Sequence, residues 1–282
     1  MILGHKKQWD NLVKMAKEKR IPHALLFLGQ EGLGKKKVAL EFAKFLFGQE
    51  PFSHPDFIFV EPVDNLISIA QIRDLIWRLF LKPFSFKFKI AIVNDAHLMP
   101  EDAQNCFLKK LEEPENSVII LITNYPNLLL PTIVSRCQKI KFYPIPKKEI
   151  KKFLTENGVG EEKAEKITEI SQGKIGEAIR FLDPQKYLER EEKIKDFKKI
   201  LQSPLYLKFN LAKELVEKNE IKETLKIWLY FLRENLINVL KKPDEKIQKL
   251  INSISILERI YYLILTKNIN KRLALEILML EL

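Results

Sequence analysis

A glycine-rich segment near the start of the chain has the residue types that bind phosphate. Residues Gly29-Gln-Glu-Gly-Leu-Gly34-Lys35 fit the pattern G-x-x-x-x-G-K of a phosphate-binding loop. In such a loop, backbone N–H groups and the start of the following helix hold the phosphates. The pattern predicts a nucleotide site at Gly29, Gly32, Gly34, Lys35 and Lys36; a plain tight turn is the alternative interpretation.

The residue after the loop lysine departs from this pattern. In nucleotide-hydrolysing loops of this type, a serine or threonine stands there, and its hydroxyl ligates Mg²⁺. This chain has Lys36, a cation that repels the metal at neutral pH. We therefore expect ATP or ADP to bind weakly or not at all, without hydrolysis.

A second candidate site residue follows an apolar run. Ile90-Ala-Ile-Val93 leads to Asp95, which has the form of a strand that presents an acid to a bound nucleotide. ATPases of this type place a glutamate next, as the general base, and this chain has Ala96. A missing general base costs about 10²–10⁴ in rate. His97 is an alternative base, but a local hydrogen-bonding role is the favoured interpretation.

Short apolar runs alternate with helical patterns in the first half of the chain. Strands are predicted at 24–28, 57–60, 90–93, 117–123 and 139–142, and helices at 6–20, 35–47, 68–81 and 100–113. Ser68 is the expected N-cap of the third helix, and Pro114 is expected to stop the fourth. This alternation predicts an α/β fold with a mainly parallel sheet that helices cover on both faces.

The second half of the chain is predicted to be helical. None of the nine glycines follows Gly176, so a turn-rich β domain is excluded there. Three short helices are expected within 147–183, and long helices follow with breaks near Pro204, Asn219 and Pro243. The predicted domains are 1–145, 146–184 and 185–282. An apolar stripe at Leu225, Trp228, Leu229, Leu232 and Leu236 is interpreted as core, with a helix–helix interface to a partner as the alternative.

Composition and charge narrow the function classes. The net charge of +11 is divided evenly, +5 in residues 1–145 and +6 in 146–282, so a nucleic-acid footprint and a heat-adapted Lys/Glu-rich surface remain equally supported. Cys106 and Cys137 cannot form a disulfide framework or a four-cysteine zinc site, and the four histidines lack metal-ligand spacing. The sequence has no signal-peptide pattern and no membrane-spanning run, so a cytoplasmic location without membrane contact is expected.

Several further motifs, in a fixed order, resemble one family. Pro22-His23-Ala24-Leu25-Leu26-Phe27 precedes the loop, and His54-Pro55-Asp56 precedes the second strand. Leu108-Lys-Lys-Leu-Glu-Glu-Pro114 ends a helix, and Ser135-Arg136-Cys137 follows the fourth strand. The chain resembles the AAA+ clamp-loader subunits of bacterial DNA polymerase III, most closely their delta-prime branch. The resemblance is strong over about residues 20–140 and implies a RecA-like P-loop domain, a helical lid and an all-α collar for oligomerisation.

The resemblance also implies roles for single residues. Arg136 corresponds to the arginine finger that reaches the ATP site of a neighbouring subunit; a structural pair with a carboxylate is the alternative. Thr123 and Asn124 correspond to sensor 1, the polar group near the terminal phosphate. The sensor 2 arginine of the motor subunits is replaced by Gly176, and Arg180 one turn later is a partial substitute.

These motifs together imply a subunit of a larger assembly. We expect a non-hydrolysing subunit that joins motor subunits and a delta subunit in a hetero-pentamer and helps to load the sliding clamp on primed DNA. The cysteine-rich zinc module of many relatives is missing between residues 47 and 53, so no zinc is expected. The alternatives are an ATP-hydrolysing motor subunit with unusual ligands and a nucleic-acid-binding module with a vestigial ATPase fold.

Overall fold

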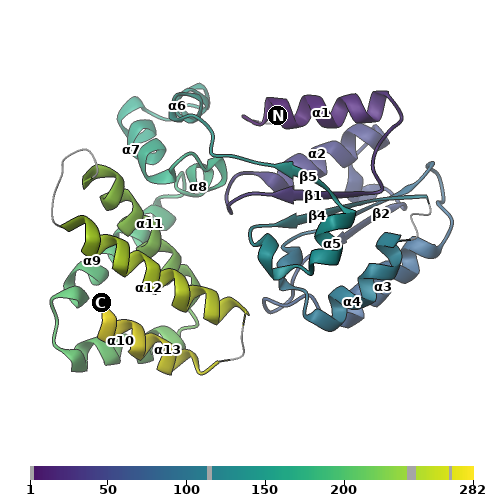
Figure 1. Cartoon of the computed structure of the whole chain (residues 1–282). Helices are drawn as coiled ribbons and strands as arrows, with labels where there is room; N and C mark the ends of the chain where they lie inside the picture. Colours follow the sequence, from purple (N-terminus) through teal and green to yellow (C-terminus); the bar gives the residue numbers. More distant parts are fainter. Residues whose placement is uncertain (1–2, 113–115, 240–245, 267–268) are drawn as a thin grey trace. The chain divides into compact units, whose positions relative to one another are not determined.

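The computed structural model describes residues 3–112, 116–239, 246–266 and 269–282. The chain forms two compact units, which divide between Ile179 and Arg180. The first unit contains the sheet, and the second consists of helices in its described residues (Figure 1).

A five-stranded parallel sheet forms the centre of the first unit. Its strands are β1 (Ala24–Leu28), β2 (Phe57–Val60), β3 (Lys89–Val93), β4 (Ser117–Thr123) and β5 (Gln138–Lys141). Their order is β2-β3-β4-β1-β5, with every pair parallel. The carboxyl ends of parallel strands meet at one edge of the sheet, so the segments that follow β1, β3 and β4 converge there.

Helices cover both faces of this sheet, as the sequence predicts. Helices α1 (Lys6–Lys17) and α2 (Lys35–Phe47) pack on one face, and α3 (Ile69–Phe80), α4 (Glu101–Glu112) and α5 (Pro131–Arg136) on the other (Figure 1). Along β1, Leu25 and Phe27 join the core under α1 and α2, whereas Leu26 joins the opposite core. Burial on both faces is why β1 to β4 are largely continuous apolar runs, whereas β5 (Gln-Lys-Ile-Lys) buries only Ile140.

Local capping signals fix the helix boundaries. The Gln71 N–H donates to Ser68 Oγ (3.2 Å), and the Ser68 N–H donates to Gln71 Oε1 (2.9 Å), a capping box that confirms the predicted N-cap. The short helix α5 was not predicted, although Pro131 stands at its first position, where proline is favoured. The predicted stop at Pro114 lies outside the described residues.

Three short helices follow β5: α6 (Lys147–Glu156), α7 (Glu161–Ser171) and α8 (Ile175–Arg180). This confirms the expected helix count in this segment. Helices α6 and α7 belong to the same compact unit as the sheet. The division of that unit into a P-loop domain and a lid stays a prediction.

The second unit is built from α9 (Pro184–Leu201), α10 (Leu205–Glu217), α11 (Ile221–Val239), α12 (Lys246–Thr266) and α13 (Lys271–Glu281). The predicted breaks near Pro204 and Asn219 are confirmed, the one near Pro243 lies outside the described residues, and the break before α13 was not predicted. The apolar stripe of α11 is core, since Trp228 is 1% exposed and packs against Phe197. The Trp228 Nε1–H donates to the Lys193 carbonyl (3.0 Å).

Candidate nucleotide-type site and surface arginine

The ammonium group of Lys35 donates hydrogen bonds to backbone carbonyls of the loop that precedes it. It donates to the carbonyls of Gly29 (2.7 Å) and Gln30 (2.6 Å) and to Asn124 Oδ1 (2.8 Å). Lys35 begins α2 and Asn124 follows β4, so the parallel topology brings them together at the carboxyl edge of the sheet. These acceptors match the three N–H groups of an ammonium ion.

Electrostatics connect this lysine to Asp95. Burial lowers the pKa of Lys35 to about 8, while the carboxylates of Asp95 and Glu31 act in the opposite direction. Burial also raises the pKa of Asp95, with a further rise from Glu31, against the effects of Lys35 and Lys36. The structure therefore brings Gly29, Lys35, Asp95 and Asn124 into one polar cluster.

Thr123 has a different role from Asn124. Its side chain is fully buried at the end of β4, and its hydroxyl accepts the Tyr125 N–H (3.1 Å). The Thr123 hydroxyl thus stabilises the turn by which the chain leaves the sheet.

Lys36 has partners on the neighbouring part of the sheet. Its ammonium lies 3.2 Å from Glu61 Oε2 and 4.8 Å from the centre of the Phe59 ring. Phe59 is on β2 and Glu61 follows it, so the long side chain of Lys36 spans from α2 to the β2 segment. An ion pair stands where a hydrolysing loop has a metal-ligating hydroxyl.

Residue 96, where related ATPases have the general base, is buried in this chain. Ala96 is fully buried, and the His97 ring packs edge-on against Tyr125, with ring centres 5.1 Å apart.

The start of α8 packs directly on the phosphate-type loop. The Gly176 N–H donates to the Gly32 carbonyl (2.7 Å), and a Cβ at position 176 would lie 2.9 Å from that oxygen. A Cβ at position 32 would meet Glu177 Cγ at 3.1 Å and Lys174 Cβ at 3.3 Å. Gly176 is therefore required by a close backbone approach, which is the physical reason for a glycine where a sensor arginine is expected.

Two features of the loop bear on magnesium and phosphate binding. The Glu177 side chain lies close to Gly32 in the middle of the loop, and the residue at position 36 has no hydroxyl. The loop can support the fold through Lys35 without a ligand.

Arg136 lies at the other end of the sheet. It is the last residue of α5, and β5 begins two residues later with Gln138 opposite Leu25 of β1. The phosphate-type loop instead follows Leu28, at the carboxyl end of β1. The two ends of β1 are about 13 Å apart at 3.3 Å per residue. Arg136 thus lies away from the phosphate-type loop of its own chain.

The Arg136 guanidinium has partners within the chain. Its Nη2 donates to Glu112 Oε1 (2.6 Å) and its Nη1 to the Thr132 carbonyl (3.0 Å). The Arg136 side chain is 35% exposed and that of Glu112 is 51% exposed. Exposed ion pairs of this kind contribute about 0–1 kcal/mol, so a competing anion can displace Glu112.

Other motif residues hold the scaffold together. His23 Nε2 donates to the Leu111 carbonyl (3.1 Å), which joins the motif before β1 to the end of α4. His5 Nε2 donates to the Leu33 carbonyl (2.7 Å), and burial lowers the pKa of His5. No spacing signal in the sequence distinguishes His5, because its partner is 28 residues away.

Asp56 organises the segment that follows α3. Its carboxylate accepts the N–H groups of Phe84 (2.7 Å), Ser85 (2.9 Å) and Phe86 (3.0 Å), and its side chain is 1% exposed. His54 stacks on Phe47 with ring centres 3.8 Å apart and accepts the Asp56 N–H (3.1 Å). The His54-Pro55-Asp56 motif thus holds in place the segment that leads into β3.

Arg180, the alternative sensor residue, pairs with Glu223 of α11. Within the described residues, no three His, Cys, Asp or Glu side chains form a metal-binding group, and both cysteines are free. None of the helices in the described ranges is long and apolar enough to cross a membrane.

Comparison with known proteins defines the class. A family model described as DNA polymerase III, delta subunit, matches residues 4–146. The chain belongs to this clamp-loader family, and its relatives identify the delta-prime type within it.

The chain is 33% identical to DNA polymerase III subunit delta' of Bacillus subtilis over 192 residues. This matched region covers 62% of this chain and 58% of that protein. It is 32% identical over 197 residues to the replication factor C small subunit of Aeropyrum pernix, over 66% of this chain and 59% of that one. A DNA polymerase III gamma subunit-related protein of Thermotoga maritima has the same fold, with a TM-score of 0.52, 25% identity and coverage of 95% and 97%. The matches to the two curated relatives thus span less than two thirds of their lengths.

Proposed function

We propose that this chain is a non-hydrolysing clamp-loader subunit. It assembles with motor subunits and a delta subunit in a hetero-pentamer, supplies Arg136 to the ATP site of a neighbour, and helps to load the sliding clamp on primed DNA. Membership of the clamp-loader family supports the assembly, and relatives named delta' support the branch.

The position of Arg136 is the observation that carries this proposal. The guanidinium is partly exposed at the amino edge of the sheet, away from its own loop. A guanidinium supplied in trans stabilises the charge on a transferring phosphoryl group, and is worth about 10³–10⁵ in rate. The weak pair with Glu112 holds Arg136 until a neighbour's phosphate replaces that carboxylate.

The geometry of the phosphate-type loop supports the non-hydrolysing part. Lys35 is bonded to its own loop, Lys36 to Glu61, and Gly176 packs on Gly32. We propose that the loop now has a structural role.

Reconstitution with motor subunits tests the finger. The complete loader is assembled with the clamp and primed DNA, and ATP turnover is compared between wild type and Arg136→Ala. We expect normal assembly, and hydrolysis about 10³-fold slower at the one site that faces Arg136. Arg136→Lys keeps the positive charge but lacks the planar guanidinium with its paired N–H donors, so this variant should recover little of the ATP turnover.

Glu112→Gln is the matched control, because it removes the ion pair and keeps the arginine. We expect turnover close to wild type. Unchanged turnover in Arg136→Ala contradicts the finger role, and an equal loss in Glu112→Gln assigns Arg136 to a structural pair. Hydrolysis by this chain alone favours a motor subunit, and tight salt-dependent DNA binding by it alone favours a nucleic-acid-binding module.

A further inference from the structure

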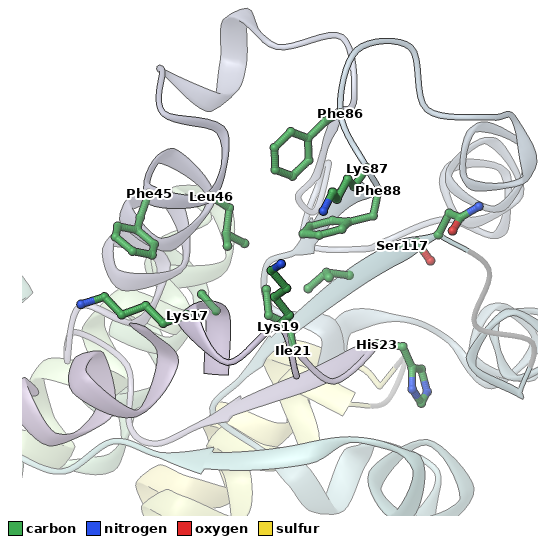
Figure 2. Close-up of a pocket in the computed structure, with 13 residues that line it drawn as sticks. Lys17, Lys19, Ile21, His23, Phe45, Leu46, Phe86, Lys87, Phe88 and Ser117 are labelled. Atoms are coloured by element: carbon green, nitrogen blue, oxygen red, sulfur yellow. The ribbon is translucent and has the colours of Figure 1, made fainter. Parts of the chain in front are cut away.

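A cavity of about 750 Å³ lies at the amino ends of β1, β3 and β4 (Figure 2). Its walls come from the end of α1, the end of α2 and the segments that enter these three strands. The Lys35 loop follows the opposite, carboxyl end of β1, so this cavity is separate from the nucleotide-type site. Its volume lies within the range of about 300–1,000 Å³ that is typical of ligand sites.

The cavity combines apolar side chains with lysines. Phe45, Phe88 and Val118 are among its apolar residues, and Lys19 and Lys87 are among its three lysines. In Figure 2, the ammonium groups of Lys19 and Lys87 lie on the Phe88 side of the cavity, while the third, Lys17, points outward. Among the described residues that line it, none is acidic, so this lining is suited to a ligand that is both apolar and negatively charged.

The lysines are available to such a ligand. Neither Lys19 nor Lys87 forms an ion pair with a carboxylate of the described residues. Both side chains are exposed.

The backbone at Lys19 is in a conformation that favours glycine. Its φ is 56°, and the bonds Lys19 N–H to Ala16 O (3.1 Å) and Arg20 N–H to Met15 O (3.0 Å) form a Schellman ending of α1. A side chain at this left-handed position costs about 1 kcal/mol relative to glycine. Despite this cost, a lysine occupies the position, and its side chain lines the cavity.

The wall that carries Phe86, Lys87 and Phe88 is preformed. The three N–H bonds to Asp56 fix residues 84–86, and the Phe86 and Phe88 rings pack edge-on at 5.0 Å. A ligand therefore does not have to order this segment, which lowers the entropic cost of binding.

Ser117, one of the residues at the cavity, has a hydroxyl without a hydrogen-bond partner among the described residues. Ser117 is 7% exposed, and its Oγ makes no hydrogen bond to any described residue. A buried hydroxyl without a partner costs about 1–3 kcal/mol. Because side chains alternate along β4, this hydroxyl lies on the sheet face of Ile119, opposite to that of Val118, and we assign it no role in binding.

We propose that this cavity binds an acidic peptide segment of a partner protein. One aromatic or large aliphatic side chain inserts against Phe88, and carboxylates on both sides of it reach Lys19 and Lys87. A peptide fits better than single-stranded nucleic acid, because lysines around one cavity do not form a track for successive phosphates.

Fluorescence anisotropy with a labelled Asp-Asp-Phe-Asp-Asp peptide tests the proposal on the full chain. We expect saturable binding that weakens at high salt. The double variant Lys19→Gln with Lys87→Gln should bind about tenfold more weakly, which corresponds to a loss of about 1.4 kcal/mol. Peptides with asparagine for aspartate, or alanine for phenylalanine, should also bind at least about tenfold more weakly.

Lys147→Gln with Lys148→Gln is the matched control, since it removes two exposed lysines of α6 outside the cavity. We expect it, and Arg136→Ala, to bind the peptide like wild type, which separates this proposal from the finger. Equal binding of the asparagine peptide, or of the Lys19/Lys87 variant, overturns the proposal. Displacement of the peptide by oligothymidine with equal loss in that variant assigns the site to nucleic acid instead.

Discussion

At the scale of residues, buried charges in this chain are satisfied by backbone groups more than by opposite charges. Lys35 donates to two loop carbonyls, and Asp56 accepts three N–H groups. Hydrogen bonds to ionised groups are stronger than those between neutral ones. Each charged side chain therefore fixes a loop: the one after β1 and the one before β3.

The Asp56 bonds predict a pH dependence of stability. Burial raises the pKa of Asp56, but the three N–H groups, with a contribution from His54, bring it below its ordinary value of 3.8. A lowered folded-state pKa gives stability that is present above the unfolded value and is lost as pH falls through the folded value. We expect wild type to exceed Asp56→Asn by about 1.5–3 kcal/mol in unfolding free energy at neutral pH, with the gap closing below about pH 4.

Urea unfolding at a series of pH values measures this gap. Asp10→Asn, an exposed residue of α1, is the control and should shift little at any pH. A gap that stays constant down to about pH 3 would show that the ionised carboxylate is not what stabilises the 84–86 segment.

At the scale of elements, the parallel strands create two functional edges. Segments after the strands carry Lys35, Asp95 and Asn124, and segments before them carry Arg136 and the cavity residues. The carboxyl edge is closed by the start of α8, which packs on Gly32.

This contact makes Gly176 sensitive to a single added methyl group. Gly176→Ala places a Cβ 2.9 Å from the Gly32 carbonyl oxygen, so the backbone of α8 or of the loop must move. Overpacking of this kind costs about 1–3 kcal/mol, and we expect a loss in that range by denaturant unfolding. At Gly160, the N-cap of α7, an added Cβ meets no atom within 4 Å, so Gly160→Ala should cost only about 0.5 kcal/mol. Equal losses in the two variants would contradict the close approach.

At the scale of the whole molecule, the two units have separate hydrophobic cores. Ile120 is fully buried in the core between the sheet and α1–α2, and Leu257 is fully buried among the helices of the second unit. Units with their own cores can unfold separately, and two-state behaviour is then not expected.

A reciprocal pair of core variants tests this independence. Leu257→Ala and Ile120→Ala should each cost about 2–5 kcal/mol. We expect faster hydrogen exchange, read by mass spectrometry, only within the unit that carries the change. Faster exchange across both units in either variant would show one cooperative unit instead.

The sequence by itself determined the strands, the helices of the first unit other than α5, the phosphate-type loop and its departures at Lys36 and Ala96. These are local signals: apolar runs, caps and residue spacing within a few positions. It also indicated the family, because the motifs occur in a fixed order.

Only the tertiary structure decided which distant groups meet. It showed the Arg136–Glu112 pair, Asp56 on the 84–86 segment, and Gly176 on Gly32. It also assembled the lysine and phenylalanine cavity from segments spread over residues 16–118. Such contacts depend on strand order and on the packing of helices across the sheet, which residue spacing along the chain does not encode.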